Sequence, residues 1–243
     1  PPVPIAEQNR QHCKLAEKFP DRLIAFASVD PHRRGGLRLF ERAVKEWGAK
    51  GLKVHSLSGF YLNDTALYPF YEKAQELGLP VLAHLGTDPP PLRSRYGQPI
   101  YLNDVAIDFP ELQIIGAHMG GIWETEAVAL AQLHPNIYLD LALKQGHAFA
   151  SPHWGDPRHG GGEAYVSHLE FYRWLRHVLD QVGPKKLMLG SDYPYIASRD
   201  DQTRWVKVFS EIPDSVREAG IQFTDEETKG ILGDNAARVL GLE

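Results

Sequence analysis

The sequence predicts an α/β fold of the (β/α)8 TIM-barrel type, and three observations favour it. Short apolar segments alternate with helical patterns, and most predicted strands begin roughly 30 residues apart, as in consecutive strand–helix–strand units. Three apolar segments end close to a metal-ligating or acid/base side chain: residues 79–83 precede His84, 112–117 precede His118, and 186–190 precede Asp192. No glycine-rich dinucleotide-binding motif follows any strand, which disfavours a doubly wound open sheet, a fold with the same local pattern.

Six segments are predicted as strands because each is short, apolar and largely without polar alternation, the pattern of strands buried on both faces of a parallel sheet. In chain order they are residues 23–29, 51–54, 80–83, 112–117, 137–141 and 186–190. Helical patterns occupy residues 5–19, 37–47, 67–77, 123–133 and 165–182. The carboxyl ends of parallel barrel strands converge on one mouth, so His84, His118 and Asp192 are expected to share one site.

The number of strands is lower than a closed barrel requires. Such a barrel has eight strands, and six are visible in the sequence. We therefore interpret residues 1–243 as a single barrel domain that is incomplete at its N-terminus, where one strand, one helix and a second strand are missing. The shortage is also consistent with weak strands that the apolar pattern does not reveal, or with an open sheet.

The composition favours one soluble domain that acts on a small molecule. Of the 243 residues, 43% are hydrophobic and 23% are charged, which is enough for a substantial core. The formal charge of −5, the pI near 6.1 and the lack of long Lys or Arg runs argue against a nucleic-acid partner. Cys13 is the only cysteine, so an intrachain disulfide is excluded and a cytoplasmic localisation is expected. No apolar stretch approaches the roughly 20 residues that span a bilayer, so no membrane partner is expected.

Short motifs occur along nearly the whole chain. They are residues 26–31 (Phe-Ala-Ser-Val-Asp-Pro), 51–55 (Gly-Leu-Lys-Val-His), 67–72 (Leu-Tyr-Pro-Phe-Tyr-Glu), 116–121 (Gly-Ala-His-Met-Gly-Gly), 190–194 (Gly-Ser-Asp-Tyr-Pro) and 235–238 (Asn-Ala-Ala-Arg). In this order they resemble the amidohydrolase superfamily, specifically the amidohydrolase-related group that includes aminocarboxymuconate semialdehyde decarboxylase and related decarboxylases and lactone hydrolases. Each motif alone is weak, whereas the combination is specific.

The resemblance implies a site for one divalent metal ion. His84 corresponds to the ligand histidine after the fifth barrel strand, although the residues alone leave open a histidine hydrogen-bonded near the rim. Asp192 corresponds to the ligand and proton-transfer carboxylate after the eighth strand, where an unpaired carboxylate would be costly. His118 corresponds to a histidine that polarises or protonates the substrate and can approach the metal. Zinc is the expected ion, and manganese, cobalt or iron are alternatives.

Several residues are candidates for substrate binding. His55 is expected to line the pocket, and Lys53 is expected to be structural. Some amidohydrolases bridge two metals through a carboxylated lysine on the corresponding strand, but the resembled group generally does not. The Gly- and Pro-rich segment 144–163 interrupts the regular spacing at the predicted mouth. Its polar side chains either bind a substrate carboxylate or hydroxyl, or form a polar lid; they are His147, His153, His159 and Arg158.

The sequence departs from the family pattern at its first strand. That strand carries an acid-x-His or His-x-His pair of metal ligands in the family, and no such pair occurs before His84. The remaining residues supply two or three ligands, fewer than a tight mononuclear site normally has. Three possibilities stay open: the chain is part of a longer protein, it is a natural truncation, or loop histidines hold the metal instead.

The predicted function is hydrolysis of an amide, lactone or similar carbonyl of a small substrate through metal-activated water. His84 and Asp192 would be ligands, Asp192 would also be the base, and His118 would stabilise developing charge. One alternative is non-oxidative decarboxylation of a small aromatic or unsaturated carboxylate, with His118 or Asp192 delivering a proton to carbon. Another is an inactive barrel fragment with a binding or assembly role. Many members of the resembled group are dimers, so a homodimer is also expected.

Overall fold

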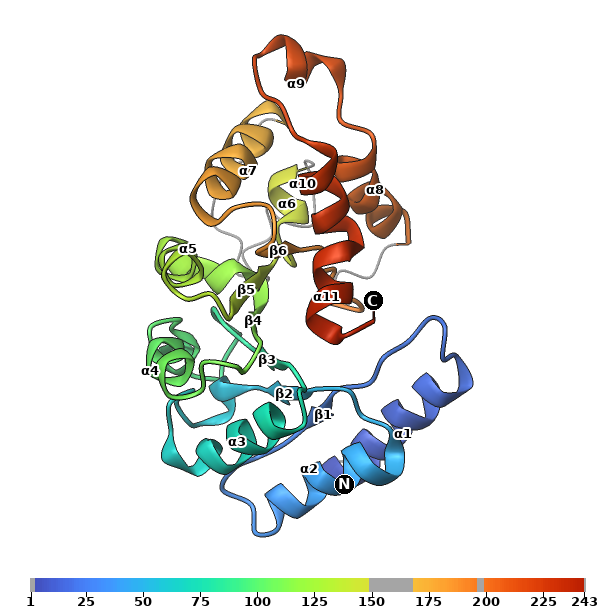
Figure 1. Ribbon diagram of the computed structural model, residues 1–243, viewed down its shortest axis with the longest axis vertical. Coiled ribbons are helices and arrows are strands. Elements are labelled where there is room, and N and C mark those ends of the chain that lie inside the picture. Colours follow the sequence, from blue (N-terminus) through green and yellow to red (C-terminus); the bar gives the residue numbers. More distant parts are fainter. Residues whose placement is uncertain (1–2, 149–167, 196–198, 243) are drawn as a thin grey trace.

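A computed structural model describes residues 3–148, 168–195 and 199–242 of the chain. Its described part contains one parallel sheet of six strands that lie in chain order, each hydrogen-bonded to the next (Figure 1). The strands are β1 (Ala27–Ser28), β2 (Leu52–Val54), β3 (Val81–Ala83), β4 (Ile114–Gly116), β5 (Ile137–Asp140) and β6 (Leu187–Met188). All six predicted strands and the predicted α/β class are therefore confirmed.

One helix precedes the first strand, and the others lie between and after the strands along the chain. They are α1 (Ile5–Lys18), α2 (Gly36–Trp47), α3 (Tyr68–Glu76), α4 (Tyr101–Asp108), α5 (Glu124–Leu133), α6 (Gln145–Ala148), α7 (His168–Val182), α8 (Arg199–Ser210), α9 (Asp214–Glu218), α10 (Asp225–Lys229) and α11 (Asn235–Leu240). The five predicted helical segments correspond to α1, α2, α3, α5 and α7, while α4, α6, α8, α9 and α10 were not predicted. None of the helices in the described segments combines the length and apolar character needed to cross a membrane.

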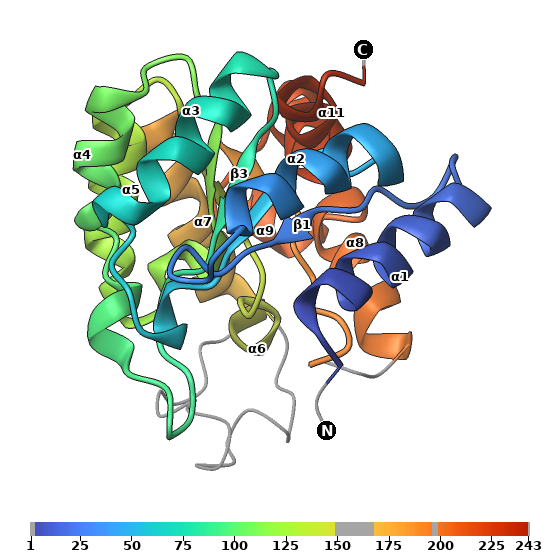
Figure 2. The ribbon, with the colours of Figure 1, turned by 90° about the horizontal axis from the view of Figure 1, so that it is seen from below.

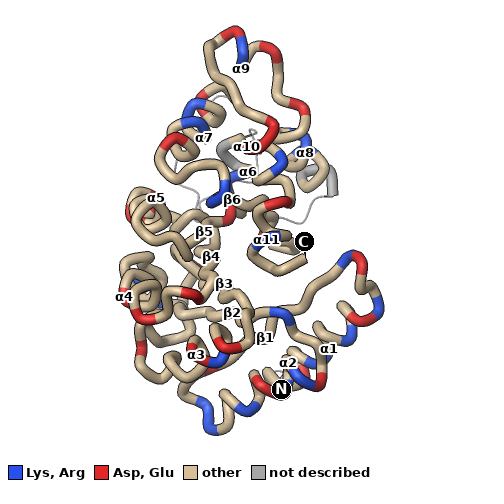
Figure 3. The backbone as a smooth tube through the Cα atoms, viewed as in Figure 1, with Lys and Arg blue, Asp and Glu red and all other residues tan. Residues whose placement is uncertain are grey.

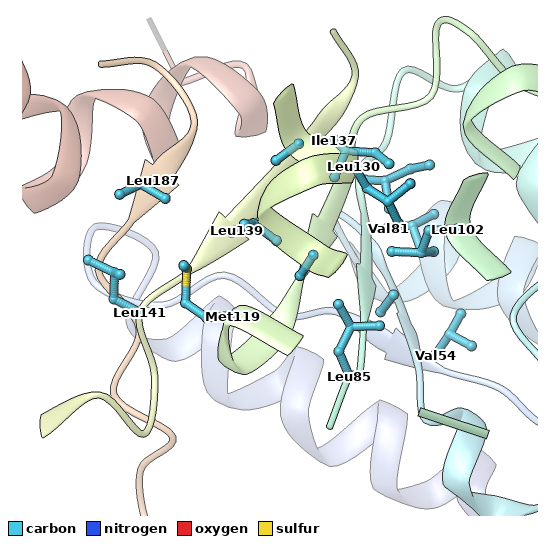
Figure 4. Close-up of a cluster of buried hydrophobic side chains, with 14 of the residues drawn as sticks. Val54, Val81, Leu85, Leu102, Met119, Leu130, Ile137, Leu139, Leu141 and Leu187 are labelled. Carbon is cyan, nitrogen blue, oxygen red and sulfur yellow. The ribbon is translucent and has the colours of Figure 1, made fainter. Parts of the chain in front are cut away.

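The main core lies between the outer face of the sheet and the helices. Leu52, Val54, Val81 and Ile114 are almost completely buried there, because alternate residues of each strand point to this face. Figure 4 shows this layer, in which Leu102 of α4 and Leu130 of α5 approach the strand residues. Lys and Arg are interspersed with Asp and Glu along the outer helices (Figure 3).

A second, smaller core lies on the inner face of the sheet. Ile115, Tyr138 and Met188 form it with Val239 of α11, and Leu82 and Ala236 pack against the same cluster. In Figure 1, α11 accordingly lies on the opposite side of the strands from α4 and α5. The helix α11 thus covers part of the face that a closed barrel turns inward.

The edge strand β1 is covered by α1, which lies beside α2 and β1 (Figure 2). Asn9 of α1 is 1% exposed, and its Nδ2 donates to the Ser28 carbonyl at 2.8 Å, while the Ser28 N–H donates to Asn9 Oδ1 at 2.9 Å. One side-chain amide thereby makes the two hydrogen bonds that a neighbouring strand would make. This pairing satisfies the backbone at an otherwise open sheet edge.

We expect Asn9→Ala to lower the free energy of unfolding by about 1–3 kcal/mol, because it leaves both backbone groups of Ser28 buried without these partners. Chemical denaturation followed by circular dichroism measures the change. Gln11→Ala is the matched control, since Gln11 is exposed on the same helix and, among the described residues, its side chain bonds only to Glu7. Equal stability of the two variants would show that the Asn9 amide does not stabilise β1.

Candidate metal centre and active site

Three potential metal ligands gather at the carboxyl ends of β2 and β3. His55 directly follows β2, His84 directly follows β3, and Asp88 lies four residues further on. One ligand atom from each residue lies within 4.8 Å of the others. The Asp88 Oδ2 is 3.1 Å from His55 Nε2 and 3.5 Å from His84 Nε2, and the two rings have centroids 4.4 Å apart.

His84 is buried, and its Nε2 has no hydrogen-bond partner among the residues that the structure describes. Burial, followed by the nearby positive charge of Lys53, lowers the pKa of His84 to about 2. Burial also lowers the pKa of His55, with Asp88 opposing this shift. Both imidazoles are therefore held neutral, which is the form that ligates a metal ion.

The chemistry of this cluster fits a divalent ion. Two imidazole nitrogens and one carboxylate oxygen are ligands that zinc and manganese accept. Coordination would also satisfy the Nε2 of His84 and remove the cost of a buried polar atom without a partner. From the sequence, His55 was expected to bind substrate and Asp88 was not selected, so the candidate ligand set from the structure differs from the predicted set.

His118 lies next to this cluster. It follows β4 by two residues, and its ring centroid is 4.9 Å from that of His84. Within the described part of the chain, its buried Nδ1 has no hydrogen-bond partner. His118 and Met119 have φ values of 61° and 52°, in the left-handed region that non-glycine residues rarely adopt. The turn therefore requires support from elsewhere in the structure.

Asp140, the last residue of β5, provides that support. Its Oδ1 accepts hydrogen bonds from the backbone N–H groups of His118 and Ala142, each at 2.9 Å. Asp140 was not selected from the sequence, although a carboxylate that ends an apolar strand was the signal that selected Asp192. Asp88 gave no such signal, because an aspartate before a run of prolines is typical of a turn.

We expect Asp140→Ala to lower the free energy of unfolding by about 1–3 kcal/mol, because two backbone donors lose their acceptor. Asp140→Asn should recover most of that stability, since a carbonyl oxygen can accept the same two bonds. Thermal and urea denaturation of both variants measure the difference. If Asn is as destabilising as Ala, the carboxylate acts through its charge rather than as a hydrogen-bond acceptor.

Asp192 approaches the same site from the segment after β6. Burial raises its pKa, while His118 and Lys53 oppose the shift, so these groups lie within electrostatic reach of one another. The preceding backbone is fixed by Trp205 Nε1, which donates to the Gly190 carbonyl at 2.8 Å, and by Gln145 Nε2, which donates to the Ser191 carbonyl at 3.1 Å.

In the structure, the rings of His84 and His118 thus contact each other, and Asp192 interacts electrostatically with His118. Their separate roles as ligand, acid or base remain predictions. His147 lies in α6, with its side chain outside the described residues. His153, Arg158 and His159 also lie outside the described residues, so their predicted substrate contacts stay predictions as well.

A family model with the description amidohydrolase matches residues 4–242, nearly the whole chain. The chain belongs to the amidohydrolase family. This confirms the resemblance found in the sequence motifs and the expectation of an enzyme of the hydrolase or carboxy-lyase kind. Among curated proteins, this amidohydrolase is similar to the 2-amino-3-carboxymuconate-6-semialdehyde decarboxylase of Dictyostelium discoideum, with 24% identity over 98% of this chain and 67% of that protein.

Solved structures confirm that the fold of this amidohydrolase is of the TIM-barrel type. An uncharacterized TIM-barrel protein of Bordetella bronchiseptica aligns with a TM-score of 0.68 and 19% identity, over 96% of this chain and 72% of its own. A dihydroxybenzoic acid decarboxylase of Polaromonas sp. JS666 aligns with a TM-score of 0.65 and 18% identity, over 97% of this chain and 74% of its own. That decarboxylase structure contains manganese and the inhibitor 2-nitroresorcinol.

Proposed function

We propose that this amidohydrolase is a metal-dependent, non-oxidative decarboxylase of a small aromatic or unsaturated carboxylate. The observation that carries the proposal is the cluster of His55, His84 and Asp88, with an unpartnered His84 Nε2, directly beside His118. From the sequence, hydrolysis was the first prediction and decarboxylation the second. The decarboxylase names of the similar proteins support the reverse order.

His55, His84 and Asp88 would hold the metal ion, with zinc or manganese as the preferred species. Asp192, in the segment after β6, remains a further candidate ligand. When bound, a divalent ion supplies positive charge that holds the substrate carboxylate and a neighbouring oxygen and polarises them. The neutral state of both imidazoles keeps these side chains available as ligands.

His118 is the residue that we assign to proton transfer. As the carbon–carbon bond to the carboxylate breaks, carbon dioxide leaves and the electron pair stays on the substrate carbon. The protonated imidazole of His118 then delivers a proton to that carbon. The electrostatic coupling between Asp192 and His118 supports the placement of this carboxylate beside the proton-transfer residue.

Hydrolysis of an amide or lactone is the second candidate, supported by the description of the family as amidohydrolase. In that reaction Asp192 takes a proton from the attacking water, and His118 stabilises the charge that develops on the carbonyl oxygen. The same metal-binding cluster serves both reactions. They differ in their products, because only decarboxylation releases carbon dioxide without consuming water.

The test is an assay of the metal-loaded chain against a panel of dihydroxybenzoates, unsaturated dicarboxylates, lactones and amides. Mass spectrometry follows the products, and carbon dioxide is measured in the same reactions. Release of carbon dioxide from an aromatic or unsaturated carboxylate supports the proposal, whereas addition of water to a lactone or amide supports hydrolysis. Turnover of no compound, with metal bound, would support the remaining alternative of an inactive binding or assembly protein.

A further inference from the structure

Asp88 reaches the candidate metal centre through a loop that is closed at its base. The loop spans residues 86–97, between β3 and α4, and the Gly86 N–H donates to the Gly97 carbonyl at 2.9 Å. Gly86 lies midway in sequence between His84 and Asp88. The position of the Asp88 carboxylate relative to the imidazoles therefore depends on where the Gly86 backbone is held.

The closure leaves no room for a side chain at Gly97. A Cβ atom at this position would lie 2.1 Å from the Gly86 carbonyl oxygen and 2.8 Å from Leu57 Cδ1. Both distances are shorter than a normal van der Waals contact, and the nearer atom belongs to the backbone, which cannot rotate away as a side chain can. Even a methyl group at Gly97 would therefore displace Gly86, and with it the segment between His84 and Asp88.

The second neighbour of Gly97 belongs to the segment of the remaining candidate ligand. Leu57 is buried and lies two residues after His55, in the 3₁₀ helix Ser56–Ser58 that follows β2. Gly97 thus packs closely against both segments that carry the ligand cluster, the one after β2 and the one after β3.

Gly86 also lies against the turn that carries His118. A Cβ atom at Gly121 would lie 2.8 Å from Gly86 Cα, and Gly121 follows His118 by three residues. The Gly86 backbone is therefore in close contact with both Gly97 and Gly121. A shift of Gly86 would change the position of the ligands relative to His118 as well as to one another.

We propose that Gly97 is a positioning residue of the metal centre. Because it leaves room for the Gly86 backbone, the loop returns Asp88 Oδ2 to within 3.1 Å of His55 Nε2 and 3.5 Å of His84 Nε2. This role rests on the proposed function only through its metal centre, and it is the same for decarboxylation and hydrolysis. A purely structural role predicts a loss of stability on substitution, whereas a positioning role also predicts a weaker and altered metal site in the folded protein.

The test uses cobalt as the probe, because the visible absorption of bound Co²⁺ depends on the number and geometry of its ligands. The metal-free parent chain and Gly97→Ala are titrated with Co²⁺, and chemical denaturation establishes that each preparation is folded. We expect Gly97→Ala to bind Co²⁺ about 10–100-fold more weakly than the parent, as is found for residues that orient ligands. Its visible spectrum at saturating Co²⁺ should also differ from that of the parent.

Gly51→Ala is the matched control. A Cβ atom at Gly51 would lie 2.2 Å from Phe26 Cε1, so this position is also crowded, but it precedes β2 and lies at the opposite end of that strand from His55. We expect this variant to lose stability and to keep the Co²⁺ affinity and spectrum of the parent. If Gly97→Ala does not fold, the same substitution in a Leu57→Ala background, which removes the side-chain part of the crowding, is compared with Leu57→Ala alone.

Unchanged Co²⁺ affinity and spectrum in Gly97→Ala would overturn the positioning role and leave the metal centre intact. Equal losses of affinity in Gly97→Ala and Gly51→Ala would also overturn it, because a general loss of stability would then explain both. No Co²⁺ binding by the parent would reject the metal centre and, with it, the role of Gly97. Weakened binding by Gly97→Ala, with no turnover of any compound by the loaded parent, retains the role of Gly97 and rejects the proposed reaction.

Discussion

Replacement of His84 by alanine is expected to remove the metal ion from the chain and abolish turnover. His84 is central to the candidate site: it lies 3.5 Å from Asp88 Oδ2 and contacts the rings of both His55 and His118. Loss of a residue that merely supports a ligand lowers metal affinity by about 10–100-fold, so loss of a ligand costs more. Elemental mass spectrometry should show about one equivalent of metal per chain in the parent, and less than about a tenth of an equivalent in His84→Ala.

His12→Ala is the matched control, since His12 is exposed on α1 and far in sequence from the cluster. It should bind as much metal as the parent. Full metal content in His84→Ala would contradict the role of His84 as a ligand and would show that other residues hold the metal. Parallel measurements on His55→Ala, Asp88→Ala and Asp192→Ala then identify the ligand set, because the sequence favoured Asp192 and the structure favours His55 and Asp88.

The second large effect is expected for His118→Ala, which should lower kcat by about 10²–10⁴-fold while metal content stays unchanged. Alanine keeps the backbone N–H that donates to Asp140, so the turn is preserved and only the imidazole is lost. Steady-state kinetics and elemental analysis on the same sample separate the two effects.

Added imidazole provides the control for His118→Ala. If His118 transfers a proton, the free base should restore part of the lost turnover in this variant and leave the parent unaffected. A variant that loses metal together with activity would instead make His118 a ligand, as the sequence also allowed.

The order of the strands was predictable because parallel strands buried on both faces form continuous apolar segments. Their lengths were not. Residues 23–29 were predicted as one strand, yet only Ala27 and Ser28 pair with β2, and Leu23 and Ile24 are exposed. Apolar character indicates that a segment approaches the core. Strand pairing also depends on the position of the neighbouring strand, and the local sequence does not determine that position.

The helix α4 was missed for a similar reason. It begins after Ile100, a residue with no capping side chain of its own. The Ile100 N–H instead donates to Glu126 Oε1 of α5, so the cap comes from another helix. A prediction based on local capping signals cannot detect a terminus that is stabilised by a tertiary contact.

The site was predictable where a functional side chain comes just after a strand, as for His84 and His118. It was not predictable where a loop folds back, as for Asp88, which reaches His55 from the neighbouring strand end. Lys53 illustrates a third case. Its residue type was evident, but the placement of three carboxylates near it, Asp140, Asp192 and Asp88, follows from the arrangement of neighbouring strand ends, which the sequence does not specify.

The position of α11 has a consequence for how the protein is made. Val239 packs on Ile115, Tyr138 and Met188, all of which are synthesised well before it. While the nascent chain emerges from the ribosome, this apolar surface stays uncovered and available to other chains or to chaperones. This part of the inner face is therefore covered only after α11 has been synthesised, and a chain truncated before this helix would expose an apolar surface that is prone to aggregation.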